Sequence, residues 1–326
     1  MTAVAQLSSV LEAGGPELAR RLQGTEVRLS EVAESHGAEL AGHASGTLAA
    51  GGKRLRPILV FLCGGTGAEG PLAAAVAVEL LHMATLVHDD VLDQASLRRG
   101  RPTVLATGGR HAATATGDFL FSRAFAELAA TRSAAAVRAL SAASSALARG
   151  ELMQRADAWS VDVTSERYLE RCELKTASLF SQACRLGAIL GDASKASRDA
   201  LGGFGRRVGL AFQILDDVLD VSGPAERTGK HRGTDLLDGT VTLPLIVARG
   251  RDAELERMDL RAAVTDPAQA DALCERIAAT GALRVARSEA LGHVAEAKAG
   301  LVDVELPPGR RKALDLVADG VVERYA

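Results

Sequence analysis

Residues 72–93 read LAAAVAVELLHMATLVHDDVLD, an apolar run that ends with three aspartates in its last five positions. Glu79 and His82 interrupt the run, which makes it too short for a bilayer span and typical of a buried helix in a soluble protein. We therefore expect no stable membrane insertion. The letters DDVLD return at residues 216–220, again behind an apolar segment, so two helices carry the same acidic end.

The residue usage favours helix throughout the chain. Ala, Leu, Glu and Arg abound in the 326 residues, and only 3% of the residues are aromatic. Such side chains lose little rotamer freedom in a helix. Helical patterns follow one another with Gly- and Pro-containing breaks, and no low-complexity linker divides them. We predict an all-α fold with a single helical domain over residues 1–326, and leave open whether residues 1–15 are a flexible N-terminus.

The net charge and the cysteine spacing indicate which binding partners and which cellular compartment to expect. A net charge of −3 provides no general surface for polyanions, so we expect no nucleic-acid binding and only a local anion site. The four cysteines lack paired or metal-type spacing, and the N-terminus has no basic region ahead of an apolar core. We therefore expect reduced thiols and a cytoplasmic protein.

The aspartates of the first acidic segment share a helix face. At about 3.6 residues per turn, one stripe carries His82, Leu86, Asp89 and Asp93. Asp90 lies about a third of a turn away. Carboxylates about 6 Å apart repel by roughly 3 kcal/mol at an effective dielectric near 20, so the cluster needs a partner. Hard oxygen ligands suit Mg²⁺ shared with substrate phosphates; a solvated helix end is the plainer interpretation, which the apolar neighbours disfavour.

The second acidic segment repeats this arrangement, and basic residues accompany the first. One stripe carries Phe212, Asp216 and Asp220, with Gln213 and Asp217 beside it. Arginine offers a planar fork that matches phosphate oxygens. The basic residues near the first segment and in a Gly-led loop are Arg98, Arg99, Arg101, Lys53, Arg54 and Arg56. A basic loop alone indicates only solubility, but beside two acidic faces it suits a diphosphate.

Four strings place the chain close to a known family. They are GGKRLRP (51–57), LLHMATLVHDDVLDQASLRRGRPT (80–103), LKTASLF (174–180) and FQILDDVLDVSG (212–223). With them the chain resembles the trans-prenyl diphosphate synthases, or polyprenyl synthetases, from about Gly51 to Pro244. The resemblance implies an all-helical homodimer with a deep central cavity. It also implies an allylic diphosphate held by three Mg²⁺ ions beside isopentenyl diphosphate.

The resemblance also implies a role for each motif residue. Contacts to isopentenyl diphosphate are expected from Lys53, Arg56, His82 and Arg99. Contacts to the allylic diphosphate are expected from Arg98, Lys175, Thr176, Gln213 and Lys230. Metal binding is expected from Asp89, Asp93 and Asp216 as direct ligands, with Asp90, Asp217 and Asp220 in supporting roles.

The residue chemistry agrees with these roles. Diphosphate leaves poorly until its charge is neutralised. The residues expected to be catalytic on this ground are Asp89, Asp93, Asp216, Lys175 and Lys230. The allylic cation that remains is attacked head to tail by the alkene of isopentenyl diphosphate, and proton loss restores a double bond. No Ser, Cys or Lys nucleophile is required.

Plainer interpretations stay open for some of these residues. His82 could pair with Glu79, three residues earlier on the same helix, and Lys175 and Thr176 could be ordinary helix positions. The segment DGTVTLP also places Thr240 where the family often has a second lysine. We therefore expect one contact to the allylic diphosphate to be missing.

Side chains just before the first acidic motif are expected to set the product length. In the family, bulky residues there form the floor of the cavity, and here Ala84 and Thr85 are small. A floor deeper in the cavity could be formed instead by Leu81, Met83, Phe119, Phe121 and Phe125. We predict a product of geranylgeranyl length or longer.

Two other functions share part of the pattern. A class I terpene cyclase would have the bundle and the first acidic motif, but its second metal motif follows an Asn/Ser/Glu pattern and it has no use for GGKRLRP. A non-catalytic regulatory subunit of a heteromeric prenyl synthase typically lacks some of the aspartates, and both triplets are complete here. A structural helical protein with incidental acidic clusters comes last.

Thr85→Phe should shorten the product, because an aromatic ring would block the growing chain near its starting point. Chromatographic sizing of the dephosphorylated products measures the effect, and Thr85→Ser serves as the small-residue control. A product of unchanged length would place the floor elsewhere.

Overall fold

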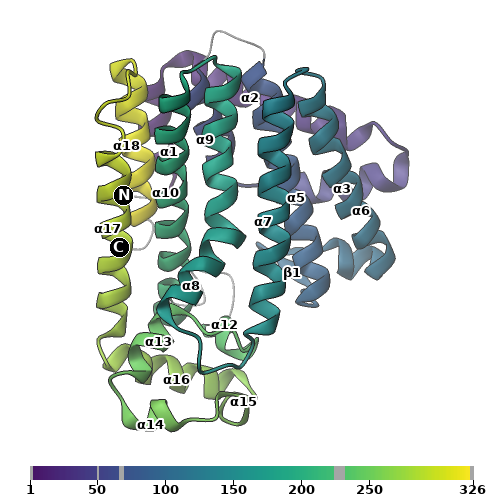
Figure 1. The fold of residues 1–326 in the computed structure, drawn as a ribbon. Coiled ribbons are helices and arrows are strands. Elements are labelled where there is room, and N and C mark those ends of the chain that lie inside the picture. Colours follow the sequence, from purple (N-terminus) through teal and green to yellow (C-terminus); the bar gives the residue numbers. More distant parts are fainter. Residues whose placement is uncertain (1–2, 50, 66–69, 224–231, 324–326) are drawn as a thin grey trace.

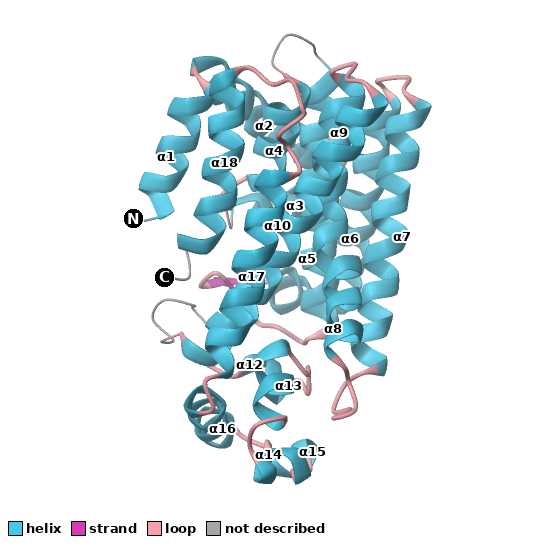
Figure 2. Cartoon of the chain, turned by 60° about the vertical axis from the view of Figure 1, so that its left-hand side comes forward, coloured by secondary structure: helices cyan, strands magenta, loops and turns pink. Residues whose placement is uncertain are grey.

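The computed structural model describes residues 3–49, 51–65, 70–223 and 232–323, which form a bundle of long helices above a smaller helical layer (Figures 1 and 2). The predicted all-α fold is confirmed. The elements are α1 (Ala3–Gly14), α2 (Pro16–Glu34), α3 (Ala38–Ala49), α4 (Leu55–Gly64), α5 (Gly70–Leu92), β1 (Leu97–Arg98), β2 (Arg101–Pro102), α6 (Val104–Ala129), α7 (Ala134–Ala156), α8 (Ser165–Cys172), η1 (Glu173–Ala177), α9 (Ser178–Leu190), α10 (Lys195–Ser222), α12 (Thr234–Leu237), α13 (Leu243–Arg249), α14 (Ala253–Arg257), α15 (Leu260–Ala263), α16 (Pro267–Ala279), α17 (Ala282–Ala299) and α18 (Pro308–Glu323).

Helix α5, which carries the first acidic segment, lies inside the bundle. It packs against α4, α6 and α9, and its buried side chains run from Pro71 to Asp90. Its 23 residues are long and apolar enough to cross a membrane, which corrects the expectation that the run is too short. Because 67% of its most apolar stretch is buried among the other helices, packing in the core accounts for this composition.

A short hairpin and a capped helix follow the first acidic segment. Strands β1 and β2 pair antiparallel, with Arg98 opposite Arg101. Thr103 then caps α6, because its hydroxyl accepts a hydrogen bond from the Ala106 N–H at 3.1 Å. Helix α6 is interrupted at Gly109, whose φ of 76° lies in the left-handed region that glycine tolerates. The hairpin therefore holds the arginine-rich segment beside the end of α5.

Helices α4 and α9 approach each other so closely that their backbones touch. A Cβ atom on Gly187 would lie 2.2 Å from the Val60 carbonyl oxygen, and one on Gly191 would lie 2.2 Å from the Gly64 carbonyl oxygen. Only glycine permits this approach. Because α9 continues directly from η1, the contact fixes the position of η1 relative to the core.

The two ends of the chain lie side by side. Helix α1 packs against α18, and Gln6 Nε2 donates a hydrogen bond to Glu323 at 2.9 Å (Figure 1). The segment left open as a flexible N-terminus is therefore helical from residue 3. One hydrophobic cluster extends from Val10 to Val321, so both ends share the core of the bundle.

Residues 222–244 follow the second acidic motif and contain four glycines, a composition typical of a loop. Its described part contains α12, and residues 224–231 lie outside the described residues. The helices α12 to α16 form the lower layer in Figure 1, next to the end of α10.

Gly187→Ala should destabilise the fold by about 1–3 kcal/mol, because the added methyl group overlaps the α4 backbone. Gly203→Ala is the matched control, since Gly203 also lies in a helix and a Cβ atom there meets nothing within 4 Å. That control should gain about 0.5–1 kcal/mol from helix propensity. Urea unfolding of both variants measures the difference, and equal midpoints would contradict the close approach.

Candidate active site

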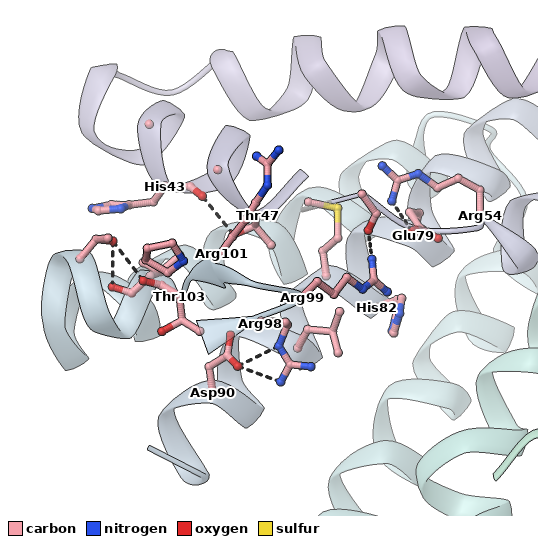
Figure 3. A pocket seen from close by; sticks show the side chains of 18 residues that line it. His43, Thr47, Arg54, Glu79, His82, Asp90, Arg98, Arg99, Arg101 and Thr103 are labelled. Atoms are coloured by element: carbon pink, nitrogen blue, oxygen red, sulfur yellow. Dashed lines mark hydrogen bonds and ion pairs between the residues drawn. The ribbon is translucent and has the colours of Figure 1, made fainter. Parts of the chain in front are cut away.

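The first acidic wall is formed by the end of α5. Asp89 is half-buried, and burial raises its pKa to about 6. Asp90 is buried and forms an ion pair with Arg98 at 2.8 Å (Figure 3). Asp93 follows the last residue of α5 and accepts a hydrogen bond from Arg155 Nη2 at 2.5 Å. Asp90 therefore supports the hairpin, in keeping with the secondary role expected for it.

The second acidic wall is the end of α10. Asp216 is exposed, whereas Asp217 is buried. The Tyr168 hydroxyl donates to Asp217 at 2.6 Å, and Gln213 Nε2 donates to its other oxygen at 2.8 Å. Burial raises the pKa of Asp217 above its ordinary value, and these two donors oppose the shift. The arrangement suits Asp217 to a supporting role behind Asp216.

Asp220 closes the second wall at its lower end. Its two carboxylate oxygens accept hydrogen bonds from the backbone N–H groups of Thr234 and Asp235, both at 3.2 Å. Asp220 thus fastens the start of α12 to α10. This position also suits a supporting role.

The LKTASLF string contains a π-helical turn, η1, at Glu173–Ala177. Lys175 Nζ forms an ion pair with Glu151 of α7 at 2.5 Å, and the Thr176 hydroxyl donates to Gln213 Oε1 at 2.6 Å. Gly150 lets α7 approach η1 closely, because a Cβ atom at this position would lie only 2.7 Å from the backbone nitrogen of Lys175. Single π-turns inside α-helices frequently mark functional sites.

Turn η1 connects the two acidic walls. Lys175 is close enough to Asp89 to oppose the rise in the pKa of that carboxyl. The next residue, Thr176, bonds to Gln213, which in turn bonds to Asp217 in the second wall. The two acidic helix ends therefore share a common cationic segment, as a diphosphate site between them requires.

A pocket of about 420 Å³ lies beside the first wall, between α3, α5 and the β1–β2 hairpin (Figure 3). The labelled side chains that line it are His43, Thr47, Arg54, Glu79, His82, Asp90, Arg98, Arg99, Arg101 and Thr103. Four arginines around one pocket favour an anionic ligand.

Two groups near this pocket carry perturbed pKa values. Burial, strengthened by Arg56 and Arg99, holds the pKa of His82 well below its ordinary value, so the imidazole is neutral at physiological pH. Burial lowers the pKa of Arg56 to about 10. Among the described residues the buried Arg56 Nε finds no hydrogen-bond partner, and its guanidinium lies 4.5 Å from the centre of the Phe180 ring. Arg56 is not among the residues that line the 420 Å³ pocket.

The expected isopentenyl diphosphate residues are only partly brought together. His82 and Arg99 line the 420 Å³ pocket, whereas Lys53 lines a separate pocket of about 30 Å³ beneath α1 and α18. Glu79 pairs with Arg54 at 2.7 Å, and the alternative in which Glu79 pairs with His82 is not observed. Arg54, which was counted among the basic residues suited to a diphosphate, instead pairs with Glu26 and Glu79 and has a structural position.

The remaining predicted residues have the following positions. Lys230 lies outside the described residues. Leu81 and Ala84 are buried in α5, and the Thr85 hydroxyl donates to the His82 carbonyl at 2.8 Å. Their role as the floor of the cavity stays a prediction.

Three further residues of the site were missed by the sequence analysis. Glu151 and Arg155 reach it from α7, and Tyr168 reaches it from α8. Charges spaced by four residues are typical of any solvent-facing helix, so the GELMQR segment gives no distinguishing signal. A lone tyrosine gives none either.

Comparison with known proteins decides the family. The sequence profile of the polyprenyl synthetases matches residues 38–280. The chain belongs to the polyprenyl synthetase family. Heptaprenyl diphosphate synthase component 2 of Geobacillus stearothermophilus is 39% identical over 288 residues, covering 87% of this chain and 86% of that protein. Geranylgeranyl diphosphate synthase of Methanosarcina mazei is 35% identical over 283 residues, covering 84% and 86%.

Solved structures agree with this membership. The polyprenyl synthase of Caulobacter crescentus, complexed with calcium and isoprenyl diphosphate, has a TM-score of 0.88 and 35% identity, with 95% of this chain and 98% of that chain covered. This polyprenyl synthetase is accordingly a prenyltransferase that acts on isoprenyl diphosphates. Enzymes of the family generally depend on divalent metal ions.

The residues present fit such a metal. The described residues hold no preformed group of three or more His, Cys, Asp or Glu ligands. Mg²⁺ does not require one, because it is usually bound by one or two carboxylates together with waters and substrate phosphates. The half-buried Asp89 and the exposed Asp216 are carboxylates of this kind at the two acidic helix ends.

Asp89→Asn should stabilise the metal-free enzyme above pH 6 by on the order of 1–3 kcal/mol. The Asp89 pKa is about 6 in the fold against the usual 3.8, so ionising the carboxyl weakens the fold as the pH rises between these values. Below about pH 4 both states are protonated and the gain should vanish.

Urea unfolding in EDTA at pH 4 and pH 8 measures this gain. The exposed Asp162 provides the control Asp162→Asn, which should show no such pH-dependent gain. An Asp89→Asn variant no more stable than the parent at pH 8 would contradict the burial of this carboxyl.

Proposed function

We propose that this polyprenyl synthetase joins isopentenyl diphosphate head to tail to an allylic diphosphate in an Mg²⁺-dependent reaction, giving a geranylgeranyl or longer product. The observation that carries the proposal is the position of η1. Lys175 interacts with Asp89 of one acidic wall, and Thr176 is hydrogen-bonded through Gln213 to the other. A diphosphate held there would meet cations and carboxylates from three elements.

The allylic diphosphate would be held between the two acidic walls. Asp89, Asp93 and Asp216 would bind Mg²⁺, which when present neutralises charge on the leaving diphosphate. Lys175 would exchange its partner Glu151 for a diphosphate oxygen. Lys230 is proposed as a second contact on the strength of the family motif alone.

Isopentenyl diphosphate would bind in the arginine-lined pocket. Arg99 and Arg101 line it, and Arg56 lies close enough to His82 to help lower the pKa of that imidazole. Because the His82 imidazole is neutral, it can donate a hydrogen bond without adding another positive charge to the arginines around the pocket. Holding the alkene beside the allylic carbon replaces a bimolecular encounter with a positioned attack.

The length of the product rests on small residues in α5. Ala84 and Thr85 precede the first acidic motif and leave room for a long chain, and Leu81 lies one turn deeper. The named relatives, which include geranylgeranyl and heptaprenyl diphosphate synthases, support a product in this range.

We also propose a cytoplasmic homodimer. Phe121 of α6 is 36% exposed and contacts the partly buried Phe125, with ring centres 5.3 Å apart, and a second copy would cover the exposed Phe121 ring. A heteromeric enzyme is the second possibility, supported by the name of the Geobacillus stearothermophilus relative, component 2.

Incubation of the purified protein with isopentenyl diphosphate, Mg²⁺ and each allylic primer in turn tests the proposed reaction. We expect linear products of twenty carbons or more, and their loss by orders of magnitude in Asp216→Asn. Asp162→Asn should retain the parent rate. Cyclic hydrocarbons would favour a terpene cyclase. No product with any primer would favour a non-catalytic subunit.

A further inference from the structure

Four charged side chains of alternating sign form a continuous chain of ion pairs across the site. Asp93 at the end of α5 pairs with Arg155 at 2.5 Å, and Arg155 Nε pairs with Glu151 at 3.0 Å. The other Glu151 oxygen pairs with Lys175 of η1 at 2.5 Å. The charges sum to zero, and the two inner members both come from the last turns of α7.

The outer members of this chain are the groups that the proposed reaction needs. Asp93 is a proposed metal ligand, and Lys175 is a proposed diphosphate contact. In this structure each pairs with an oppositely charged side chain of α7. Neither Glu151 nor Arg155 belongs to the strings that mark the family.

We infer that Arg155 is a positioning residue that couples metal binding to diphosphate binding. The inference rests on the proposed function. A bare cation that binds Asp93 competes with the Arg155 guanidinium, which already bonds to one of the two Asp93 carboxylate oxygens, and the two positive charges repel. A cation that arrives with diphosphate offers phosphate oxygens to both Arg155 and Lys175, so the ion pairs are exchanged instead of lost.

The coupling must act in both directions. If diphosphate raises the affinity for the metal, the metal raises the affinity for diphosphate by the same factor. Occupation of Asp93 by Arg155 therefore disfavours a metal-loaded but substrate-free site. Helix α7 favours this position of Arg155, because a cation in the last turn of a helix is stabilised by the negative end of the helix dipole.

Mn²⁺ binding to the full-length enzyme tests the inference without any turnover. Free Mn²⁺ is counted by electron paramagnetic resonance, with and without inorganic pyrophosphate, and a protein-free sample corrects for the Mn²⁺–pyrophosphate complex. Arg155→Met should bind Mn²⁺ alone about 3–10-fold more tightly, because Asp93 has lost its competitor. The enhancement by pyrophosphate should shrink by a similar factor. Arg155→Lys, which keeps the positive charge, should retain much of the enhancement by pyrophosphate.

Arg167→Met is the control, because Arg167 pairs with Asp157 at 2.7 Å and touches none of the four residues. It should match the parent in both measurements. An Arg155→Met variant with unchanged Mn²⁺ affinity and an unchanged pyrophosphate effect would overturn the inference while leaving the proposed reaction intact. Absence of Mn²⁺ binding by the parent, with pyrophosphate present, would overturn the proposed metal-dependent function itself.

Discussion

Carboxylates gathered at the ends of α5 and α10 repel one another, and their apolar surroundings make that repulsion strong. The surrounding structure gives three of them separate hydrogen-bond or ion-pair partners. Asp90 has Arg98, Asp93 has Arg155, and Asp217 has the hydroxyl of Tyr168. Asp89 keeps a raised pKa, which indicates that its charge is incompletely compensated. Partners from several elements thus offset part of this concentrated negative charge.

The sequence was a good guide to the elements whose signal is periodic. The apolar run of α5, the shared stripe of Asp89 and Asp93, and the repetition of the acidic end on α10 all follow from helical spacing. Asp90 was expected off that stripe, and it indeed faces the hairpin arginine Arg98. Periodicity succeeds here because the contacts are decided within one helix.

Contacts between side chains of separate helices could not be predicted from helical periodicity. Glu151 and Arg155 have the spacing of an ordinary surface ion pair, and only the approach of α7 to η1 gives them a role. Lys53 and Arg56 were expected to act together, but Arg54 between them has a φ of 50° and turns the loop. As a result Lys53 and His82 line different pockets. Backbone conformation at a single residue leaves no pattern in the sequence.

The meeting of α1 and α18 has a practical consequence. Gln6 and Leu7 from one end, with Gly320 and Val321 from the other, cover the small pocket that Lys53 lines. Removal of α1 or of the last turns of α18 would therefore open this pocket and take from Lys53 of the basic loop the side chains that now cover it.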